Sequence, residues 1–190
     1  KLLSETIPTI KEVNVETAAI QYVYYVRAKT SSGSETFLVK EFYRVRYSGS
    51  RLYLLNFRRT MEAVFNPKLT SVRKSQFKIG VSNESNFQLT LNDKANELAF
   101  VRNGSLWYYD MDKDNLHEVF SFAQKKTDYL RDTYDQHNIK LLNFDDNNTI
   151  NFVVYGYMNC GDYEGRVAVI LYNYDPAKNL ITERVYIPLE

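Results

Sequence analysis

The residues with the clearest chemical potential lie in one stretch, 155–166, which reads YGYMNCGDYEGR. It holds three tyrosines, two carboxylates, an arginine and the only cysteine of the chain. Asp162 and Glu164 could form the acid–base pair of a glycoside hydrolase, with tyrosine rings beside them to stack on a sugar. A spacing of two residues fixes no distance between the carboxylates, however. The pattern is equally typical of a loop that binds a ligand or a partner.

We expect this loop to bind through its polar and aromatic side chains. The expected binding set is Tyr155, Tyr157, Asn159, Asp162, Tyr163, Glu164 and Arg166. An extended hairpin that packs on a neighbouring sheet would use the same residues, so that interpretation stays open. No residue is expected to be catalytic, and no cofactor is expected.

The remaining reactive side chains are scattered along the chain. Cys160 would need a base beside it to act as a nucleophile, and the spacing pairs neither His117 nor His137 with it. Two histidines and one cysteine at these positions do not form a zinc motif. No activated thiol or zinc site is therefore expected.

An Asp-x-Asp-x-Asp run at 110–114 has the spacing of the first ligands of a calcium loop. The sixth position of such a loop is normally glycine and the twelfth a bidentate glutamate. Here those positions hold Asn115 and Ser121. The run is therefore interpreted as a polar turn, and no metal is expected.

Charge is distributed unevenly along the chain. Residues 1–83 contain 14 Lys and Arg against 6 Asp and Glu (+8), and residues 84–190 contain 10 against 17 (−7). This asymmetry suits a contact between copies or with a charged partner. The basic run from Lys40 to Arg59 alternates with aromatic residues, but a net charge of +1 argues against nucleic acid. A single cysteine rules out an internal disulfide, and no apolar run approaches the ~20 residues of a transmembrane helix.

A repeat in the second half of the chain must position these residues. Residues 87–103 return 52 positions later as residues 139–155. At this offset the matches are Leu89 with Leu141, Asp93 with Asp145, Asn96 with Asn148, Leu98 with Ile150, and Phe100 with Phe152. Each copy predicts four antiparallel strands, and Asn103-Gly104 predicts a hairpin turn. Apolar side chains on both faces of the expected strand at 149–158 predict a sheet sandwiched between neighbours.

The pattern predicts an all-β chain built from antiparallel four-stranded repeats. We expect one domain, or a fragment of one, over 1–190, with units at 18–65, 87–122 and 139–188, an N-terminal arm at 1–16 and a linker at 123–138. Units of this kind are typical of propeller blades, and about three are too few for a ring of ~4–8. The chain is then part of a larger propeller, or a homodimer completes the ring. A β-sandwich is the alternative fold.

The stretch YGYMNCGDYEG, followed by VAVILYNY, resembles a region of uncharacterised extracytoplasmic proteins of Gram-positive bacteria. Those proteins are membrane-anchored and have propeller-like β repeats. The resemblance is clearest over 128–188, and it predicts a basic residue where Cys160 stands. It implies a location outside the membrane, through an anchor upstream of this chain, with a cytoplasmic location as the alternative.

Together these features predict a non-enzymatic module that binds an unknown protein or cell-surface ligand, with sensing as one role. The alternative is a module that binds or hydrolyses polysaccharide through the 155–166 loop.

Overall fold

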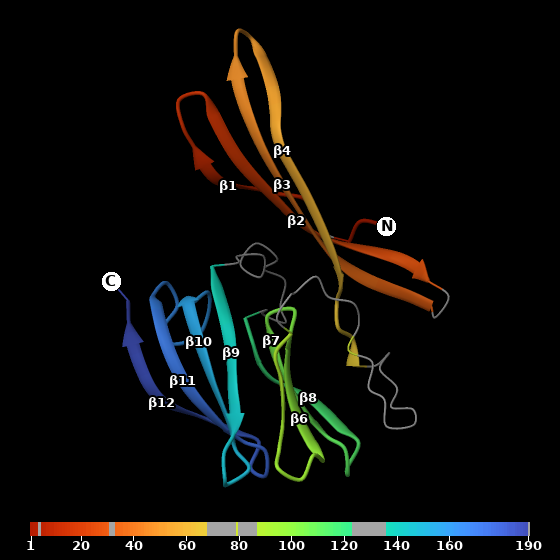
Figure 1. Cartoon of the computed structure of the whole chain (residues 1–190), viewed down its shortest axis with the longest axis vertical. Coiled ribbons are helices and arrows are strands. Elements are labelled where there is room, and N and C mark those ends of the chain that lie inside the picture. Colours follow the sequence, from red (N-terminus) through yellow and green to blue (C-terminus); the bar gives the residue numbers. More distant parts are fainter. Residues whose placement is uncertain (4, 31–32, 68–78, 80–86, 123–135, 190) are drawn as a thin grey trace. The chain divides into compact units, whose positions relative to one another are not determined.

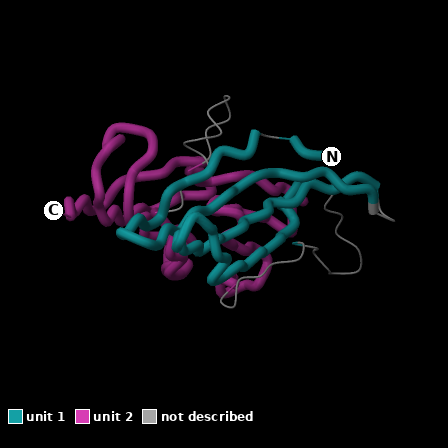
Figure 2. The backbone as a smooth tube through the Cα atoms, turned by 90° about the horizontal axis from the view of Figure 1, so that it is seen from above, with its two compact units in different colours: residues 1–84 teal, residues 85–190 magenta. Residues whose placement is uncertain are grey.

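The computed structural model describes residues 1–3, 5–30, 33–67, 79, 87–122 and 136–189. Throughout these residues the chain forms β-strands and no helix. The strands make three open, antiparallel sheets of four strands each (Figure 1). The all-β class and the four-stranded repeats are thus confirmed. The chain divides into two compact units, residues 1–84 and 85–190 (Figure 2).

The first unit contains one sheet with the strand order β1-β2-β3-β4. Its strands are β1 (Pro8–Val13), β2 (Thr17–Thr30), β3 (Gly33–Ser48) and β4 (Arg51–Ala63). The segment expected to be an arm therefore supplies the first strand, and Leu2 adds an isolated bridge to Val26. Gly49 and Ser50 have φ values of 54° and 75°. Positive φ at both central residues is what a tight hairpin between twisted strands requires.

The second unit contains the two repeated sheets. The first has β5 (Leu89–Leu91), β6 (Glu97–Arg102), β7 (Ser105–Asp110) and β8 (Asn115–Ser121). The second has β9 (His137–Phe144), β10 (Ile150–Tyr157), β11 (Val167–Asp175) and β12 (Leu180–Pro188). These strands fall where the repeat predicts them. Most of the expected linker, 123–135, lies outside the described residues.

The two copies agree in register as well as in strand order. Val119 in β8 and Arg184 in β12 are both left unpaired by a β-bulge, at equivalent positions. A further bulge occurs in β9 at Leu142 and has no counterpart in β5. This extra residue shifts the structural offset from 52 to 53, so that Asn92 is the equivalent of Asp145.

The turn after the bulge restores the offset of 52. Asn92 closes its turn by a backbone hydrogen bond to Glu97, whereas Asp145 closes its turn one residue sooner, to Thr149. The sequence match of Asp93 with Asp145 is therefore wrong as a structural equivalence. The match of Asn96 with Asn148 is wrong as well, because Asn148 corresponds to Ala95: both have positive φ and donate their N–H to the carbonyl of the first turn residue. In both turns the side-chain oxygen of the first residue accepts backbone N–H groups, those of Asn96 and Glu97 in one copy and of Asn147 and Thr149 in the other.

The two sheets of the second unit pack face to face over a shared core. Leu106 from one sheet and Phe152, Val154 and Ile170 from the other are at most 1% exposed. Gln88, just before β5, ties the sheets together at the edge of β9: its amide donates to Ile139 O and its oxygen accepts from Leu141 N–H, both at 2.9 Å. The β9–β12 sheet was predicted to be covered on both faces; in the described chain its other face stays largely exposed.

Candidate functional site

The 155–166 loop, singled out by its composition, is closed by its own backbone. Met158 N–H donates to Arg166 O at 2.8 Å, and Gly165 N–H donates to Met158 O at 2.9 Å. Gly156 enters the loop with a φ of 105°, and a Cβ at this position would lie 2.2 Å from the carbonyl oxygen of Gln136. Only glycine fits there, because the start of β9 crosses so closely.

Two members of the expected binding set serve as packing residues. Tyr163 stacks on Tyr186 with ring centroids 4.0 Å apart and an interplanar angle of 10°, and its hydroxyl donates to Glu183 at 2.9 Å. Asn159 is 3% exposed and donates to the carbonyl of Phe122 at 3.0 Å. The loop is thereby fastened to β12 on one side and to the end of the preceding sheet on the other.

The other members point in different directions. Tyr155 pairs with Val169 on one face of the sheet. Val154, Ile170 and Tyr186 lie on the opposite face. Tyr157 ends β10 and is half-buried, whereas Asp162, Glu164 and Arg166 are exposed. The structure does not gather the seven side chains into one site.

The aspartates at 110–114 have separate partners. Asp110 is buried, pairs with the Lys113 amino group at 2.8 Å and accepts two backbone N–H groups, so its pKa is held below the ordinary range. Asp112 accepts from Asn96, and Asp114 accepts from the Tyr109 hydroxyl. The turn recurs as Tyr174–Asn179, where Lys178 pairs with Asp175. Among the described residues no cluster of His, Cys, Asp and Glu could hold a metal ion.

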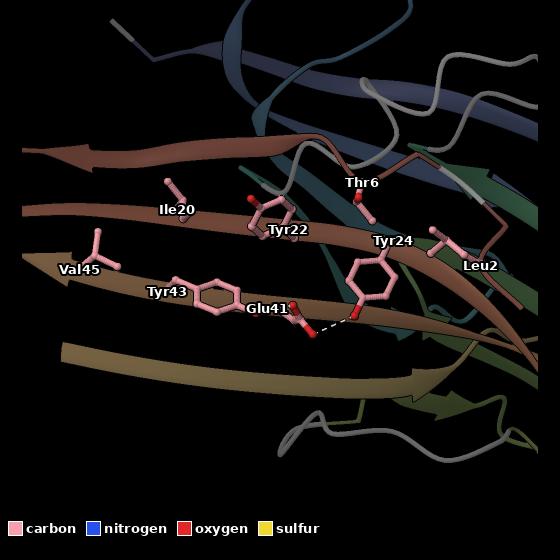
Figure 3. Close-up of a pocket in the computed structure, with 8 residues that line it drawn as sticks. All are labelled: Leu2, Thr6, Ile20, Tyr22, Tyr24, Glu41, Tyr43 and Val45. Carbon is pink, nitrogen blue, oxygen red and sulfur yellow. Dashed lines mark hydrogen bonds between the residues drawn. The ribbon is translucent and has the colours of Figure 1, made fainter. Parts of the chain in front are cut away.

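A candidate site that the sequence did not indicate lies on the first sheet. It is a hollow of about 530 Å³ over β2 and β3, bordered by the N-terminal segment (Figure 3). The residues that line this tyrosine hollow are Leu2, Thr6, Ile20, Tyr22, Tyr24, Glu41, Tyr43 and Val45. Its volume falls in the range typical of small-ligand and anchor-residue pockets, 300–1,000 Å³.

Strand alternation and register bring the hollow together. Tyr22 and Tyr24 are two residues apart on β2, as are Glu41 and Tyr43 on β3, so all four share one face. Tyr22 pairs with Glu41 directly across the two strands. Leu2, which bridges to Val26, and Thr6, which precedes β1, also line the hollow (Figure 3).

A buried carboxylate fixes the rings of the hollow. Glu41 is 7% exposed and accepts hydrogen bonds from the hydroxyls of Tyr24 and Tyr43, both at 2.8 Å, and from Arg59 Nε at 2.6 Å. Tyr43 also meets Tyr22 edge to face at 5.9 Å between centroids. The Tyr24 and Tyr43 rings are thus held at their hydroxyls by Glu41, and the Tyr22 ring packs against Tyr43.

The pKa shifts follow from this geometry. Burial acts to raise the pKa of Glu41, but the hydrogen bonds from Tyr43, Tyr24 and Arg59 outweigh it and hold the pKa below its ordinary value. Burial and the bond to Glu41 raise the pKa of Tyr24, and the bond to Glu41 raises that of Tyr43. Glu41 is therefore ionised at neutral pH and accepts three hydrogen bonds. Its role is to orient the rings rather than to transfer a proton.

The arrangement offers preorganised aromatic surface without net charge, because Arg59 balances Glu41. Such a site can hold an apolar or aromatic group with little loss of side-chain entropy on binding. The pairs Tyr22/Tyr24 and Glu41/Tyr43 were visible in the sequence as alternating strand positions. Tyr22 and Glu41 are 19 residues apart in the sequence, and only the register between β2 and β3 shows that the two pairs lie side by side.

Comparison with protein-family models and with curated proteins finds no match to this chain. In the described part of the chain there is no helix long and apolar enough to cross a membrane.

Proposed function

We propose that this chain is a non-enzymatic, extracytoplasmic interaction module made of propeller-type blades, and that it binds a protein through the tyrosine hollow. Consecutive blades of a propeller pack face to face. In support of blades, the two sheets of the second unit pack in this way, β5 contacts β9, and the sheets share the outer-strand bulge. The resemblance over 128–188 supports a location outside the membrane.

The observation that carries the proposal is the hollow together with the apolar surface around it. Ile10, Leu54, Phe57 and Met61 lie on the same face of the first sheet by strand alternation, and each is 44–67% exposed. Monomeric proteins rarely leave such a large apolar expanse uncovered unless it binds another protein or a membrane. A protein with an apolar or aromatic anchor for the hollow fits this surface.

The charge of the first unit adds a second criterion. Residues 1–84 contain 14 Lys and Arg against 7 Asp and Glu, a net charge of +7. A partner with an acidic rim around its apolar anchor would be attracted and oriented. Polysaccharide binding by the 155–166 loop has less support, because one face of the Tyr163 ring is already stacked on Tyr186.

The test is site-specific photo-crosslinking in cells that express the parent gene. A crosslinker at position 22 or 54 should capture one protein, and the purified pair should bind with an affinity that Tyr22→Ala and Leu54→Asp each lower by at least ~10-fold. Leu180→Asp is the matched control, since Leu180 is 52% exposed in the second unit. Capture only from positions 162 and 164 would contradict the proposal.

Two further measurements test the location and the absence of turnover. Protease added to intact cells should cleave the chain, as it would not if the chain were cytoplasmic. A panel of glycans should give neither binding nor hydrolysis; turnover that Asp162→Asn or Glu164→Gln abolishes would instead establish the glycoside hydrolase.

A further inference from the structure

The β9–β12 sheet has a second apolar face, which we call the outer face. Register places two rows of side chains on it: Val153, Leu171 and Val185, then Tyr155, Val169 and Ile187. Tyr155, Val185 and Ile187 are 41–49% exposed, and the other three are half-buried. The covered face of the same sheet is nearly inaccessible to solvent, with Phe152 and Val154 at 0%.

The repeat shows what the outer face is built to contact. Val101 pairs with Leu106, and Leu106 with Phe120, in the β5–β8 sheet. In the β9–β12 sheet the equivalent row is Val153, Leu171 and Val185. The row of Val101, Leu106 and Phe120 packs against the β9–β12 sheet. The ring centroid of Phe120 lies 5.9 Å from those of both Phe152 and Tyr172. The outer face therefore repeats a surface that receives another sheet.

From this equivalence we infer that the outer face packs against the outer face of a second copy of this chain, across a two-fold axis. The inference is independent of the tyrosine hollow. If the repeat continued, a further sheet would pack on the outer face. That sheet would present the face equivalent to the one that carries Leu98 and Phe100 in the β5–β8 sheet. Those residues are already 5% and 0% exposed, so that face of a second copy is not free. Among the described residues of the second unit, the outer face is the apolar sheet face that is left open.

Size and charge suit such a contact. Four strands spaced ~4.8 Å apart, with eight residues rising ~3.3 Å each, cover about 500 Å² on each copy. Two such faces reach the ~1,000 Å² expected of a specific interface. Lys140 and Arg184 lie at this face on its edge strands β9 and β12, and Asp175, at the end of β11, pairs with Lys178 at 2.8 Å. They would stay at the wet rim, as charged residues do in stable interfaces.

The test is the mass of the purified full chain in solution, measured by light scattering and sedimentation from 1 to 200 μM. The expected mass is that of two chains, and Leu171→Asp should raise the dimer dissociation constant at least ~100-fold. Leu54→Asp, an equally drastic change at a residue 60% exposed on the first sheet, should leave the dimer intact. Thermal unfolding should show that both variants remain folded, since neither residue lies in a core.

A positive readout comes from dimers mixed from differently labelled copies. Isotope-filtered NMR should then show contacts between methyl groups of Val153, Leu171 and Val185 of one copy and those of the other. A monomer at 200 μM, a dimer that survives Leu171→Asp, or a dimer that only Leu54→Asp dissociates would each overturn the inference. The last result would assign the contact to the first sheet instead.

Discussion

His117 Nε2 lies 2.5 Å from the hydroxyl oxygen of Tyr174, and this contact joins β8 of one sheet to β11 of the next. The Tyr174 hydroxyl donates its proton to Asn179 at 2.9 Å, so it accepts from His117 and fixes the imidazole proton on Nε2. Burial lowers the pKa of His117 and raises that of Tyr174 to about 12. A neutral pair is thus enclosed between the two sheets.

This pair makes the stability of the second unit depend on pH. Burial lowers the pKa of His117 in the folded chain, so the unfolded chain takes up a proton at this residue more readily below the ordinary pKa of 6.5. Stability is therefore complete above about pH 6.5 and declines as the pH falls below it. His117→Gln keeps an amide that can donate to Tyr174 but cannot titrate. Urea unfolding at pH 7.5 and 5.5 should show a smaller loss in the variant; equal losses would contradict this role.

Gly156 tests how closely the loop is fitted to β9. Gly156→Ala places a Cβ 2.2 Å from a backbone oxygen at a φ of 105°. We expect at least about 2 kcal/mol of destabilisation in urea unfolding, because neither backbone can move freely. Gly161→Ala is the matched control: its φ is 82°, but a Cβ meets no atom within 4 Å. It should cost only about 1 kcal/mol of backbone strain. Equal losses in the two variants would show that the crossing at Gln136 is not tight.

Glu41 should stabilise the first unit only while it is ionised. Glu41→Gln removes the charged acceptor of Tyr24, Tyr43 and Arg59, and we expect a loss of about 1–2 kcal/mol at pH 7. Because the folded pKa of Glu41 is lowered, its contribution is present above the ordinary value of 4.5 and is lost as the pH falls below it. The difference between wild type and variant should shrink from pH 7 to pH 3.5. A difference that does not change with pH would assign the effect to packing alone.

Gln88 tests the link between the two repeated sheets. Gln88→Ala removes both of its hydrogen bonds to the edge of β9 and should lower the unfolding free energy by about 1–3 kcal/mol. Gln88→Glu keeps the acceptor for Leu141 N–H but sets a carboxylate oxygen against Ile139 O, so its loss in urea unfolding should be at least as large as that of Gln88→Ala. An unchanged protection of the Leu141 amide in Gln88→Ala would show that water replaces the glutamine without cost.

Much of the fold could be predicted from local chemistry. The Asn103-Gly104 signal gives the expected turn, with φ values of 51° and 76°, and period-two alternation locates the strands of the second unit. The strand β1 was missed, because its residues are all exposed and carry no buried stripe. The composition of the 155–166 stretch predicted a loop with polar side chains such as Asp162 and Glu164, which are exposed in the structure. Its internal packing, such as the stacking of Tyr163 on Tyr186, depends on contacts between strands that spacing alone does not give.

The bulge at Leu142 and the shortened turn at Asp145 have a consequence for how this chain can change over time. The bulge takes up one extra residue within β9, and the turn is one residue shorter, while the core side chains of β9 keep their face. Together they cancel, and Leu98 and Phe100 keep the same places as Ile150 and Phe152. A one-residue insertion in this strand can be taken up by a bulge, and a one-residue deletion by a shorter turn, without moving the core side chains to the other face. Single-residue changes of length in this part of the repeat should therefore be tolerated one at a time.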